Sequence, residues 1–392
     1  MEEAVETIVA GAGPAGALAA LALAHEGFEV VLVGPVPAAD RRTSAVMVPG
    51  LEHLERFGLA DKLKREGAPL RAMRIVDATR RLLRSPPVTF RASEIGEEAF
   101  GWNIPNAGLN AVLADAVDAE PRIRRITESV THWVSDETGV TAALSSGSAL
   151  RAKLAVAADG RSSPAREAAG IEVLRRKLPQ SALVVNFRHS RDHGFVSTEF
   201  HTETGPFTQV PLPGQRSSLV WVVRPEEASA LAGLDDFELS RRIETRMQSC
   251  LGAVEVEPGR QVYPLASALP RRFAAKRTAL VGEAAHLFPP IGAQGLNLGI
   301  RDVRDLAEAA ARDRTDPGST SVLDSFDRKR RTDVVARSAG VELLNQSLLS
   351  SALPVQLGRG LALTALERIP RLRGALMRSW LGRSPVALVS GK

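Results

Sequence analysis

The N-terminal stretch from Thr7 to Phe28, TIVAGAGPAGALAALALAHEGF, constrains the fold more than any other part of the sequence. Hydrophobic spacing predicts a strand over Val5–Ala10, a glycine turn, and a helix over Pro14–His25. Such a turn brings backbone N–H groups to the helix N-terminus, where the helix dipole favours a phosphate. The segment therefore predicts an α/β fold that binds the pyrophosphate of a dinucleotide through Gly11, Gly13 and Gly16.

The second strand, predicted over Glu29–Val33, ends in an unusual residue. Folds of this kind commonly place Asp or Glu there, roughly 20 residues after the glycine turn, to bind a ribose. This chain has Gly34 instead. The loss of one hydrogen bond costs on the order of 1 kcal/mol, so we expect a weakened site rather than a lost one. On this reasoning a glutamate introduced at Gly34 is expected to be tolerated and to tighten binding.

Composition places the chain among ordinary globular proteins. Of its 392 residues, 44% are hydrophobic and 24% charged, enough for two or three cores. The single cysteine, Cys250, excludes an internal disulfide or dithiol and fits a reducing compartment. The acidic start, MEEAVE, does not resemble a secretory signal. The apolar run from Ile8 to Ala24 is interpreted as strand and helix, because its glycines build a turn. These features predict a cytoplasmic protein.

Positive charge is concentrated at the C-terminus. Residues 355–392 carry seven cations and one acid, a net +6 against +5 for the whole chain. This distribution, together with only 4% aromatic residues, argues against a nucleic-acid partner. A helix predicted after Pro370 would place Leu372, Leu376, Met377 and Trp380 on one side, interrupted by Arg373. Peripheral binding to the inner face of the cytoplasmic membrane and packing onto the protein body remain equal alternatives.

The remaining pattern predicts an α/β domain with an inserted, mainly antiparallel sheet. Four extended runs lie between Ser181 and Pro225, and the chain after Asp302 is almost wholly helical. Further predicted elements are helices over Ala45–Phe57, Asn106–Ala119 and Ala228–Leu251, extended segments over Met73–Val76 and Leu82–Val88, a hairpin over Val130–Leu144, and buried strands over Leu154–Ala158 and Ala279–Gly282. We expect one domain from residues 1–72, 94–173 and 262–330, a sheet domain from 73–93 and 174–261, and a C-terminal helical region over 331–392.

Two further motifs combine a strand-end acid with glycines. Asp159 and Gly160, in AVAADGRSSPARE, follow a buried strand, so the acid can reach the first glycine turn. The simpler interpretation is an ordinary Asp-Gly turn. The stretch ALVGEAAHLFPPIGAQGLNLGIRD places Glu283 at a strand end and opens a helix there, before Gly292, Gly295 and Gly299. These glycines allow a flat ligand to approach the backbone at a helix start.

Together, the three motifs resemble those of the FAD-dependent aromatic-ring hydroxylases, the class A flavoprotein monooxygenases. Within that class the chain is most similar to the ubiquinone-biosynthesis hydroxylase family, from about Val5 to about Leu349. The resemblance implies a FAD-binding Rossmann-like domain of the glutathione-reductase and p-hydroxybenzoate-hydroxylase type. Besides the three glycines of the first turn, it implies cofactor contacts from Arg42, Asp159, Gly160, Glu283, Pro290, Gly295, Leu296 and Asn297.

The implied activity needs no protein nucleophile and no metal. NAD(P)H would reduce FAD, O₂ would react to give a flavin hydroperoxide, and one oxygen would pass to the ring of a lipophilic phenol or quinone precursor. Partners would be that substrate and other ubiquinone-biosynthesis proteins. Gly34 and Ala107, where many relatives carry an acid and an arginine, keep a non-catalytic flavin- or lipid-binding subunit as an alternative. Another is a prenyl-lipid reductase or halogenase on the same fold.

Three histidines and one charged run each have a functional and a simpler interpretation. His189 and His193 are interpreted as a solvated turn rather than metal ligands. Glu199, His201 and Glu203 share one face of a strand, so His201 is a weak catalytic candidate for removing a phenolic proton. A solvent-facing strand edge is the simpler interpretation. The run Asp327–Arg331 is read as the exposed face of a helix.

Overall fold

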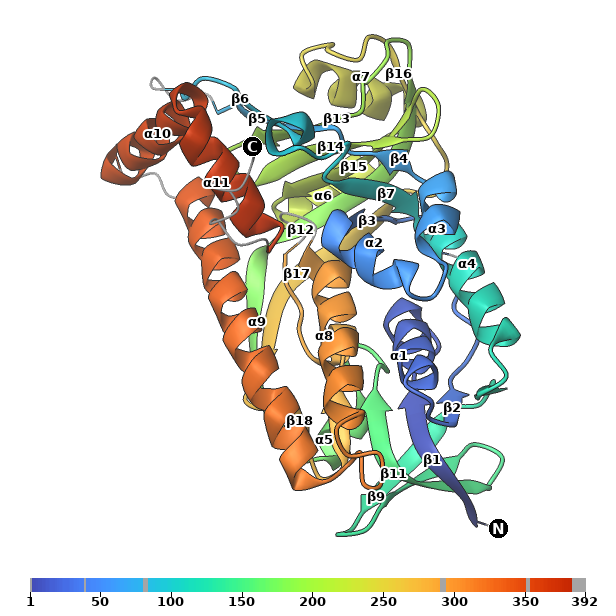
Figure 1. The fold of residues 1–392 in the computed structure, drawn as a ribbon. Helices are drawn as coiled ribbons and strands as arrows, with labels where there is room; N and C mark the ends of the chain where they lie inside the picture. The colour runs from blue at the N-terminus through green and yellow to red at the C-terminus, as the bar shows by residue number, and fades with distance from the viewer. Residues whose placement is uncertain (1, 39, 80–83, 290–293, 350–352, 383–392) are drawn as a thin grey trace.

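A computed structural model describes residues 2–38, 40–79, 84–289, 294–349 and 353–382. It is an α/β structure in which two eight-stranded sheets lie one above the other, with a long pair of strands running between them (Figure 1). The first sheet has the order β18-β19-β11-β1-β2-β8, and the β9–β10 hairpin extends β11. Its strands are β1 (Glu2–Ala10), β2 (Val30–Val33), β8 (Ile123–Ile126), β9 (Val130–Ser135), β10 (Val140–Leu144), β11 (Ala149–Ala157), β18 (Ala274–Ala275) and β19 (Thr278–Leu280).

The predicted strand–turn–helix is confirmed at the centre of this sheet. β1 pairs in parallel with both β2 and β11, and α1 forms the crossover connection between β1 and β2. Helix α1 (Pro14–His25) is buried from Gly16 to Ala24, because it packs between the sheet and the helices α4 (Asn106–Ala119) and α8 (Gln294–Ala310). Small alanine side chains permit that close packing on every side.

A three-stranded sheet corrects the helix predicted over Ala45–Phe57. The first part of that segment is the strand β3 (Thr43–Met47), and only then does the helix α2 (Val48–Glu55) begin. β3 pairs along its whole length with β7 (Gly101–Pro105), which also pairs with β4 (Ala68–Pro69). Long-range pairing thus overrides the local helical pattern. The short helix α3 (Ala60–Glu66) follows.

The second large sheet confirms the predicted antiparallel insertion. Its order is β16-β12-β15-β14-β13-β5-β6, with β17 also paired to β12. The strands are β5 (Ala72–Asp77), β6 (Val88–Arg91), β12 (Val173–His189), β13 (Val196–His201), β14 (Pro206–Leu212), β15 (Arg216–Val223), β16 (Val254–Val256) and β17 (Gln261–Pro270). Strand pairing begins only at Val88, later than the extended segment predicted from Leu82, and residues 82–83 lie outside the described residues.

Helices that follow β15 in the chain cover one face of this second sheet. The predicted helix Ala228–Leu251 is instead two helices, α6 (Pro225–Ala232) and α7 (Asp236–Arg246), because the chain turns after Gly233 and Asp235 caps α7. They enclose a core in which Phe207, Trp221 and Leu239 are fully buried. The opposite face turns toward the first sheet and the C-terminal helices.

A long helix beside the first sheet corrects the interpretation of Asp327–Arg331. Arg330 lies within α9 (Thr320–Leu349) and is fully buried, and Asp327 is also buried. The Arg330 guanidinium donates to Asp302 and Asp305 on α8, each at 2.8 Å. Arg330 therefore joins α9 to α8, because a buried arginine requires paired carboxylates, whereas Arg328, Lys329 and Arg331 are exposed on the helix as predicted.

The C-terminal region folds back onto the body as α10 (Leu353–Arg368) and α11 (Pro370–Trp380), the latter as predicted. The apolar side predicted for α11 is partly buried and partly exposed. Met377 is buried beside Phe100 and Met47, and Trp380 meets the Phe100 ring edge-on, whereas Leu372 and Leu376 are exposed. Among the described residues, no helix is both long and apolar enough to cross a bilayer.

Short 3-10 and helical turns complete the described structure. They are η1 (Ala92–Ile95), α5 (Pro164–Ala168) and η2 (Gly282–Ala284). A longer helix was predicted across GEAAH, but η2 is only a 3-10 turn. Gly282 adopts φ +60°, and its N–H donates to Asp302 Oδ2, so the backbone here departs from helical geometry.

Candidate functional site

The three glycine motifs meet at one edge of the first sheet. Ala10 of β1 pairs with Ala157 of β11, which in turn pairs with Leu280 of β19, so the three strands end side by side. The carboxyl ends of parallel strands are where open α/β sheets bind their ligands. Residues separated by more than 250 positions in the sequence therefore line a single site.

The three glycines of the first turn play different structural roles. At Gly11, which has φ +107°, and at Gly16, a Cβ would lie less than 3.0 Å from backbone atoms, of Ala158 and of Gly11 respectively. Both are therefore required by packing alone. A Cβ at Gly13 would meet nothing within 4 Å, although Gly13 begins α1. Gly13 thus opens a space at the positive end of the helix dipole, which suits a phosphate.

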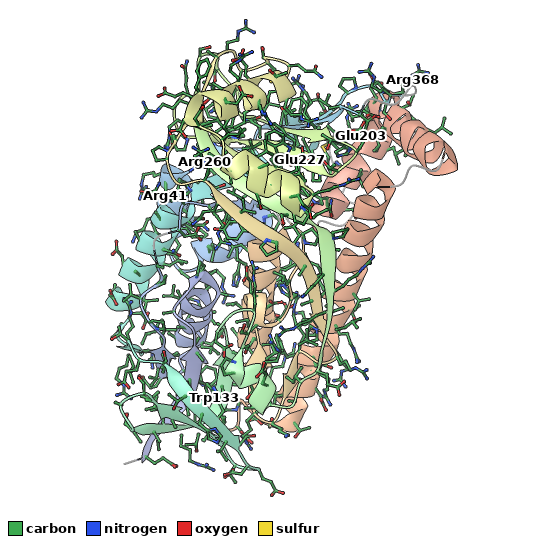
Figure 2. The ribbon with its side chains drawn as sticks, turned by 180° about the vertical axis from the view of Figure 1, so that it is seen from behind. Arg41, Trp133, Glu203, Glu227, Arg260 and Arg368 are labelled. Atoms are coloured by element: carbon green, nitrogen blue, oxygen red, sulfur yellow. The ribbon has the colours of Figure 1, made fainter. Side chains whose placement is uncertain are left out.

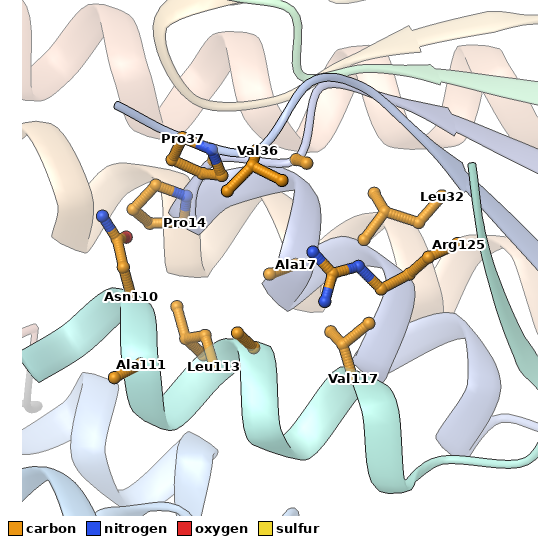
Figure 3. A pocket seen from close by; sticks show the side chains of 13 residues that line it. Pro14, Ala17, Leu32, Val36, Pro37, Asn110, Ala111, Leu113, Val117 and Arg125 are labelled. Atoms are coloured by element: carbon orange, nitrogen blue, oxygen red, sulfur yellow. The ribbon is translucent and has the colours of Figure 1, made fainter. Parts of the chain in front are cut away.

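A cavity of about 220 Å³ adjoins Gly13 and forms one end of the site (Figure 3). Apolar side chains from α1, β2 and α4, including Leu32 and Val117, make most of its wall. The Arg125 side chain from β8 reaches between Leu32 and Val117, and Asn110 lies near Pro14 at the other end. Arg125 also donates to Asp118 at 2.7 Å. No local sequence motif marks Arg125, since only strand order brings β8 to this place.

Gly34 is required by the packing of the same turn. A Cβ at this position would lie 2.7 Å from the Ala12 backbone nitrogen. The Gly34 N–H donates to Ile126 O at 3.0 Å, and Gly11 N donates to Val33 O at 2.7 Å. The expectation that glutamate is tolerated at Gly34 is therefore wrong, because the strand end lies directly against the glycine turn.

The second motif presents a buried acid next to this turn. Asp159 Oδ2 accepts a hydrogen bond from Ala165 N at 3.1 Å, while Oδ1 is buried without a partner among the described residues. Burial raises the pKa of Asp159, against the opposing effect of a hydrogen bond from Ser163. Gly160 has φ +85° and open space around it. An unpaired buried oxygen is costly, so it indicates a missing donor such as a ligand hydroxyl.

Arg166 ties the second motif to the third. Its guanidinium is buried and donates to Ala284 O and to Arg161 O, both at 2.9 Å. Arg161 in turn pairs with Glu283 at 2.9 Å, where both side chains are about half exposed. The carboxylate of Glu283 can therefore still be reached by a ligand. Arg166 was not singled out from the sequence, although it lies in the quoted motif.

Arg42 lies farther along the same side but is already paired. It forms a two-pronged ion pair with Asp40 and lies over the ring of Tyr263, 5.3 Å from its centroid. Asn106, next to the departure at Ala107, also donates to Asp40 at 2.7 Å. A ligand contact from Arg42 must therefore share this guanidinium with Asp40.

The N-terminus of α8 supplies the other end of the site. A Cβ at Gly295 would meet nothing within 4 Å, and Leu296 is half-buried beside it. The Asn297 side chain accepts from Met47 N at 2.9 Å and donates to Ala45 O at 2.8 Å, so its amide group holds β3. Pro290 and Gly292 lie outside the described residues.

The histidine candidates are buried, contrary to both simpler interpretations. His189 ends β12 and His193 lies in the turn before β13, so the turn is as predicted, but both side chains are buried, with Ser217 and the Leu212 carbonyl as their partners. His201 is buried because β13 is an interior strand, between β14 and β5. Among the described residues, no three His, Cys, Asp or Glu side chains are placed to share a metal ion.

These features fit an elongated dinucleotide. The open space at Gly13, the cavity beside it, the unpaired Asp159 oxygen and the open backbone at Gly295 follow one another along the sheet edge. The first and third motifs are packed together directly, since a Cβ at Gly282 would touch Ala15 and one at Gly299 would touch Gly282. Pyrophosphate, ribityl and ring portions of FAD each find a matching environment.

Comparison with known proteins agrees with this geometry. Residues 4–339 match the FAD binding domain family. Ubiquinone hydroxylase UbiL of Rhodospirillum rubrum is 33% identical over 97% of this chain and 90% of its own. The 3-demethoxyubiquinol 3-hydroxylase of Escherichia coli is 28% identical over 96% and 98%. The crystal structure of p-nitrophenol 4-monooxygenase PnpA from Pseudomonas putida superposes with a TM-score of 0.78 at 22% identity, covering 97% of each chain, and shares the fold.

The match over almost the whole chain and the glycine motifs at the sheet edge support the same family. The chain belongs to the FAD binding domain family of flavoproteins and, within it, to the ubiquinone-biosynthesis hydroxylases of the class A flavoprotein monooxygenases.

Proposed function

We propose that this protein hydroxylates the aromatic ring of a polyprenylated phenol in ubiquinone biosynthesis, with FAD, NAD(P)H and O₂. The observation that carries the proposal is the position of the glycine motifs. They lie at the edge of the first sheet that faces the second sheet, where side chains on the second sheet are only half-buried. The chain's similarity to ubiquinone hydroxylases over almost its whole length supports the substrate class.

The proposed FAD site runs along the sheet edge. Gly11, Gly13 and Gly16 would hold the pyrophosphate, Asp159, Gly160 and Glu283 the ribityl region, and Gly295, Leu296 and Asn297 the ring, with Arg42 and Pro290 as further contacts. When bound, FAD supplies the redox chemistry that activates O₂. The chain's own residues position the groups and exclude water.

The inserted sheet would hold the substrate. Its inner face offers Met73, Ile75, Val210 and Val220, which are half-buried although they lie on interior strands. Half-burial at the middle of a sheet indicates space in front of it, and apolar side chains there suit a prenylated ring. We accordingly divide the chain into a FAD-binding domain of residues 1–72, 94–173 and 262–330, a sheet domain of 73–93 and 174–261, and a helical region of 331–392.

The test of this activity uses the purified, FAD-loaded protein. We expect NAD(P)H oxidation to accelerate when 2-prenylphenol is added, and ¹⁸O from ¹⁸O₂ to appear in the ring of the product. Expression in an Escherichia coli strain lacking 3-demethoxyubiquinol 3-hydroxylase should restore ubiquinone. Bound FAD without ¹⁸O incorporation from any phenol would favour the reductase or the non-catalytic subunit instead, and halide-dependent product would favour the halogenase.

A membrane-docking surface would bring the enzyme to this lipophilic substrate. The described residues include nine large hydrophobic side chains that are strongly exposed. Four of these lie close together in the sequence: Leu361 on α10, Ile369 between the two helices, and Leu372 and Leu376 on α11. Arg368, which flanks them, lies at the outer end of the molecule, opposite the end that carries Trp133 (Figure 2). Each cation near an anionic bilayer contributes about 1 kcal/mol. We propose peripheral binding to the inner face of the cytoplasmic membrane through this surface.

Substitution tests this surface better than truncation, because the inner side of α11 packs into the body. Arg373 pairs with Glu94 at 2.7 Å, and Met377 is buried. We expect a double variant that carries both Leu372→Glu and Leu376→Glu to co-sediment at least about tenfold less than the parent protein with phosphatidylglycerol vesicles at low salt. Leu174→Glu, at an exposed position elsewhere, is the matched control. Equal sedimentation of all three proteins would refute the docking surface.

A further inference from the structure

An acid–histidine pair lies in the middle of the second sheet. Glu199 is on β13 between Thr208 of β14 and Ile75 of β5, and His201 is two residues farther along the same face. The Nε2–H of His201 donates to Glu199 Oε1 at 2.7 Å, because an ionised carboxylate can only accept. A hydrogen-bonded acid–histidine pair inside a largely apolar sheet is expensive to bury, so it calls for an explanation.

The geometry leaves one carboxylate oxygen available. Glu199 Oε1 accepts from His201, whereas among the described residues Oε2 has a hydrogen-bond partner only in Thr208 Oγ1, at 3.5 Å. The Glu199 side chain is 18% exposed, and that of His201 only 4%. The carboxylate, rather than the imidazole, is therefore the group that an incoming molecule can touch.

The two faces of the sheet at this point differ sharply. Phe200, Phe207 and Trp221 point to the other face and are fully enclosed by the helices α6 and α7. On the Glu199 face, the neighbouring Ile75 and Thr208 remain half-buried. The carboxylate thus belongs to the open face and not to the closed core.

The same face leads to the proposed ring end of the FAD site. Met73 lies two residues before Ile75, roughly 7 Å along β5, and packs against the cluster that contains Met47. The Met47 N–H donates to Asn297 of the α8 N-terminus. These contacts link β5, which runs beside Glu199, to the N-terminus of α8.

We propose that Glu199 binds the ring hydroxyl of the phenolic substrate and takes its proton during hydroxylation, with His201 as a positioning residue. This inference rests on the proposed function. As the new C–O bond forms on the ring, the hydroxyl electron pair moves into the ring and its oxygen becomes a carbonyl. The strongly acidic proton on that oxygen passes to Glu199 Oε2. The ring then loses its C–H proton and the oxygen regains one, while O₂ and NAD(P)H supply the oxygen atom and the electrons.

Few other charged groups face this pair. On β5, Asp77 lies opposite His201, but its carboxylate accepts from Thr79 and Ser85. The neighbouring strand β14 contributes Thr208 and Pro206, neither of which titrates. Glu203, beyond the end of β13, is exposed at the same end of the molecule as Arg368 (Figure 2). Glu199 is therefore the proposed proton acceptor on this face.

Glu199→Gln tests the proton transfer, because glutamine still bonds His201 and the hydroxyl but cannot take a proton. We expect the Kd for 2-prenylphenol, read from the FAD absorbance change without NAD(P)H, to stay within about threefold. Hydroxylation should fall by roughly 100-fold or more, with NAD(P)H electrons diverted to hydrogen peroxide. Glu203→Gln is the matched control and should behave as the parent protein.

Two further measurements keep the inference falsifiable. The acid limb of kcat/KM should disappear in Glu199→Gln, and a nitrophenol that is already ionised in solution should be hydroxylated by parent and variant at similar rates. His201→Gln should lower the rate less than Glu199→Gln does, since it acts through the carboxylate. Parent protein that hydroxylates phenols, with an equally active Glu199→Gln or an unchanged acid limb, would overturn this inference alone. Parent protein inactive with every phenol would instead overturn the proposed function.

Discussion

Gly295→Val separates the cofactor site from the stability of the fold. A Cβ at Gly295 meets nothing within 4 Å, and the glycine lies at the start of a helix without a positive φ. Valine is intrinsically more helix-stabilising than glycine by a few tenths of a kcal/mol, so the apoprotein should unfold at the parent temperature. The added methyl groups would instead enter the space proposed for the flavin ring.

The expected cost falls on FAD binding alone. Overpacking of a fitted site costs about 2–3 kcal/mol, which corresponds to a roughly 30- to 150-fold higher Kd for FAD. The protein should therefore be purified colourless, and titration with FAD followed by fluorescence quenching gives the Kd.

Gly16→Ala is the contrasting variant, because its Cβ would collide with the Gly11 carbonyl. It should lower the melting temperature even without FAD. Parent-like FAD occupancy in Gly295→Val would remove the α8 N-terminus from the site. A large drop in apoprotein stability would show that Gly295 is packed, which is contrary to the geometry.

Three further outcomes follow from the structure. Gly34→Glu should lower the free energy of unfolding and weaken the free energy of FAD binding, each by about 1–3 kcal/mol, because its Cβ would displace the Ala12 backbone. A tighter FAD Kd would contradict this. Arg125→Ala should weaken FAD binding by roughly fivefold in fluorescence titration while the melting temperature of the apoprotein stays unchanged. Burial lowers the pKa of His53 to about 4, so the unfolded state alone gains its proton below pH 6.5. The free energy of unfolding in urea should therefore fall by about 2 kcal/mol between pH 7 and 4.5, and His53→Phe should abolish that part.

The cofactor cradle could be predicted from the sequence because its determinants are local. The spacing of Gly11, Gly13 and Gly16 and the apolar periodicity of β1 and α1 describe one strand–turn–helix unit, whatever surrounds it. Asp159 and Glu283 likewise follow buried strands directly. The common edge at which they meet then follows from parallel pairing, which the alternation of strands and helices already implies.

Only the tertiary structure decided which side chains are enclosed and which strand pairs with which. β3 replaces a predicted helix because β7 pairs with it in register from a distant part of the sequence, for example at Ala45 and Asn103, 58 residues apart. His201 is buried because β5, from a distant part of the chain, covers the free edge of β13. Arg330 appears charged and exposed in sequence but meets Asp302 and Asp305 only when α9 packs on α8. Burial and strand order depend on contacts between remote segments, and a local sequence pattern does not encode those contacts.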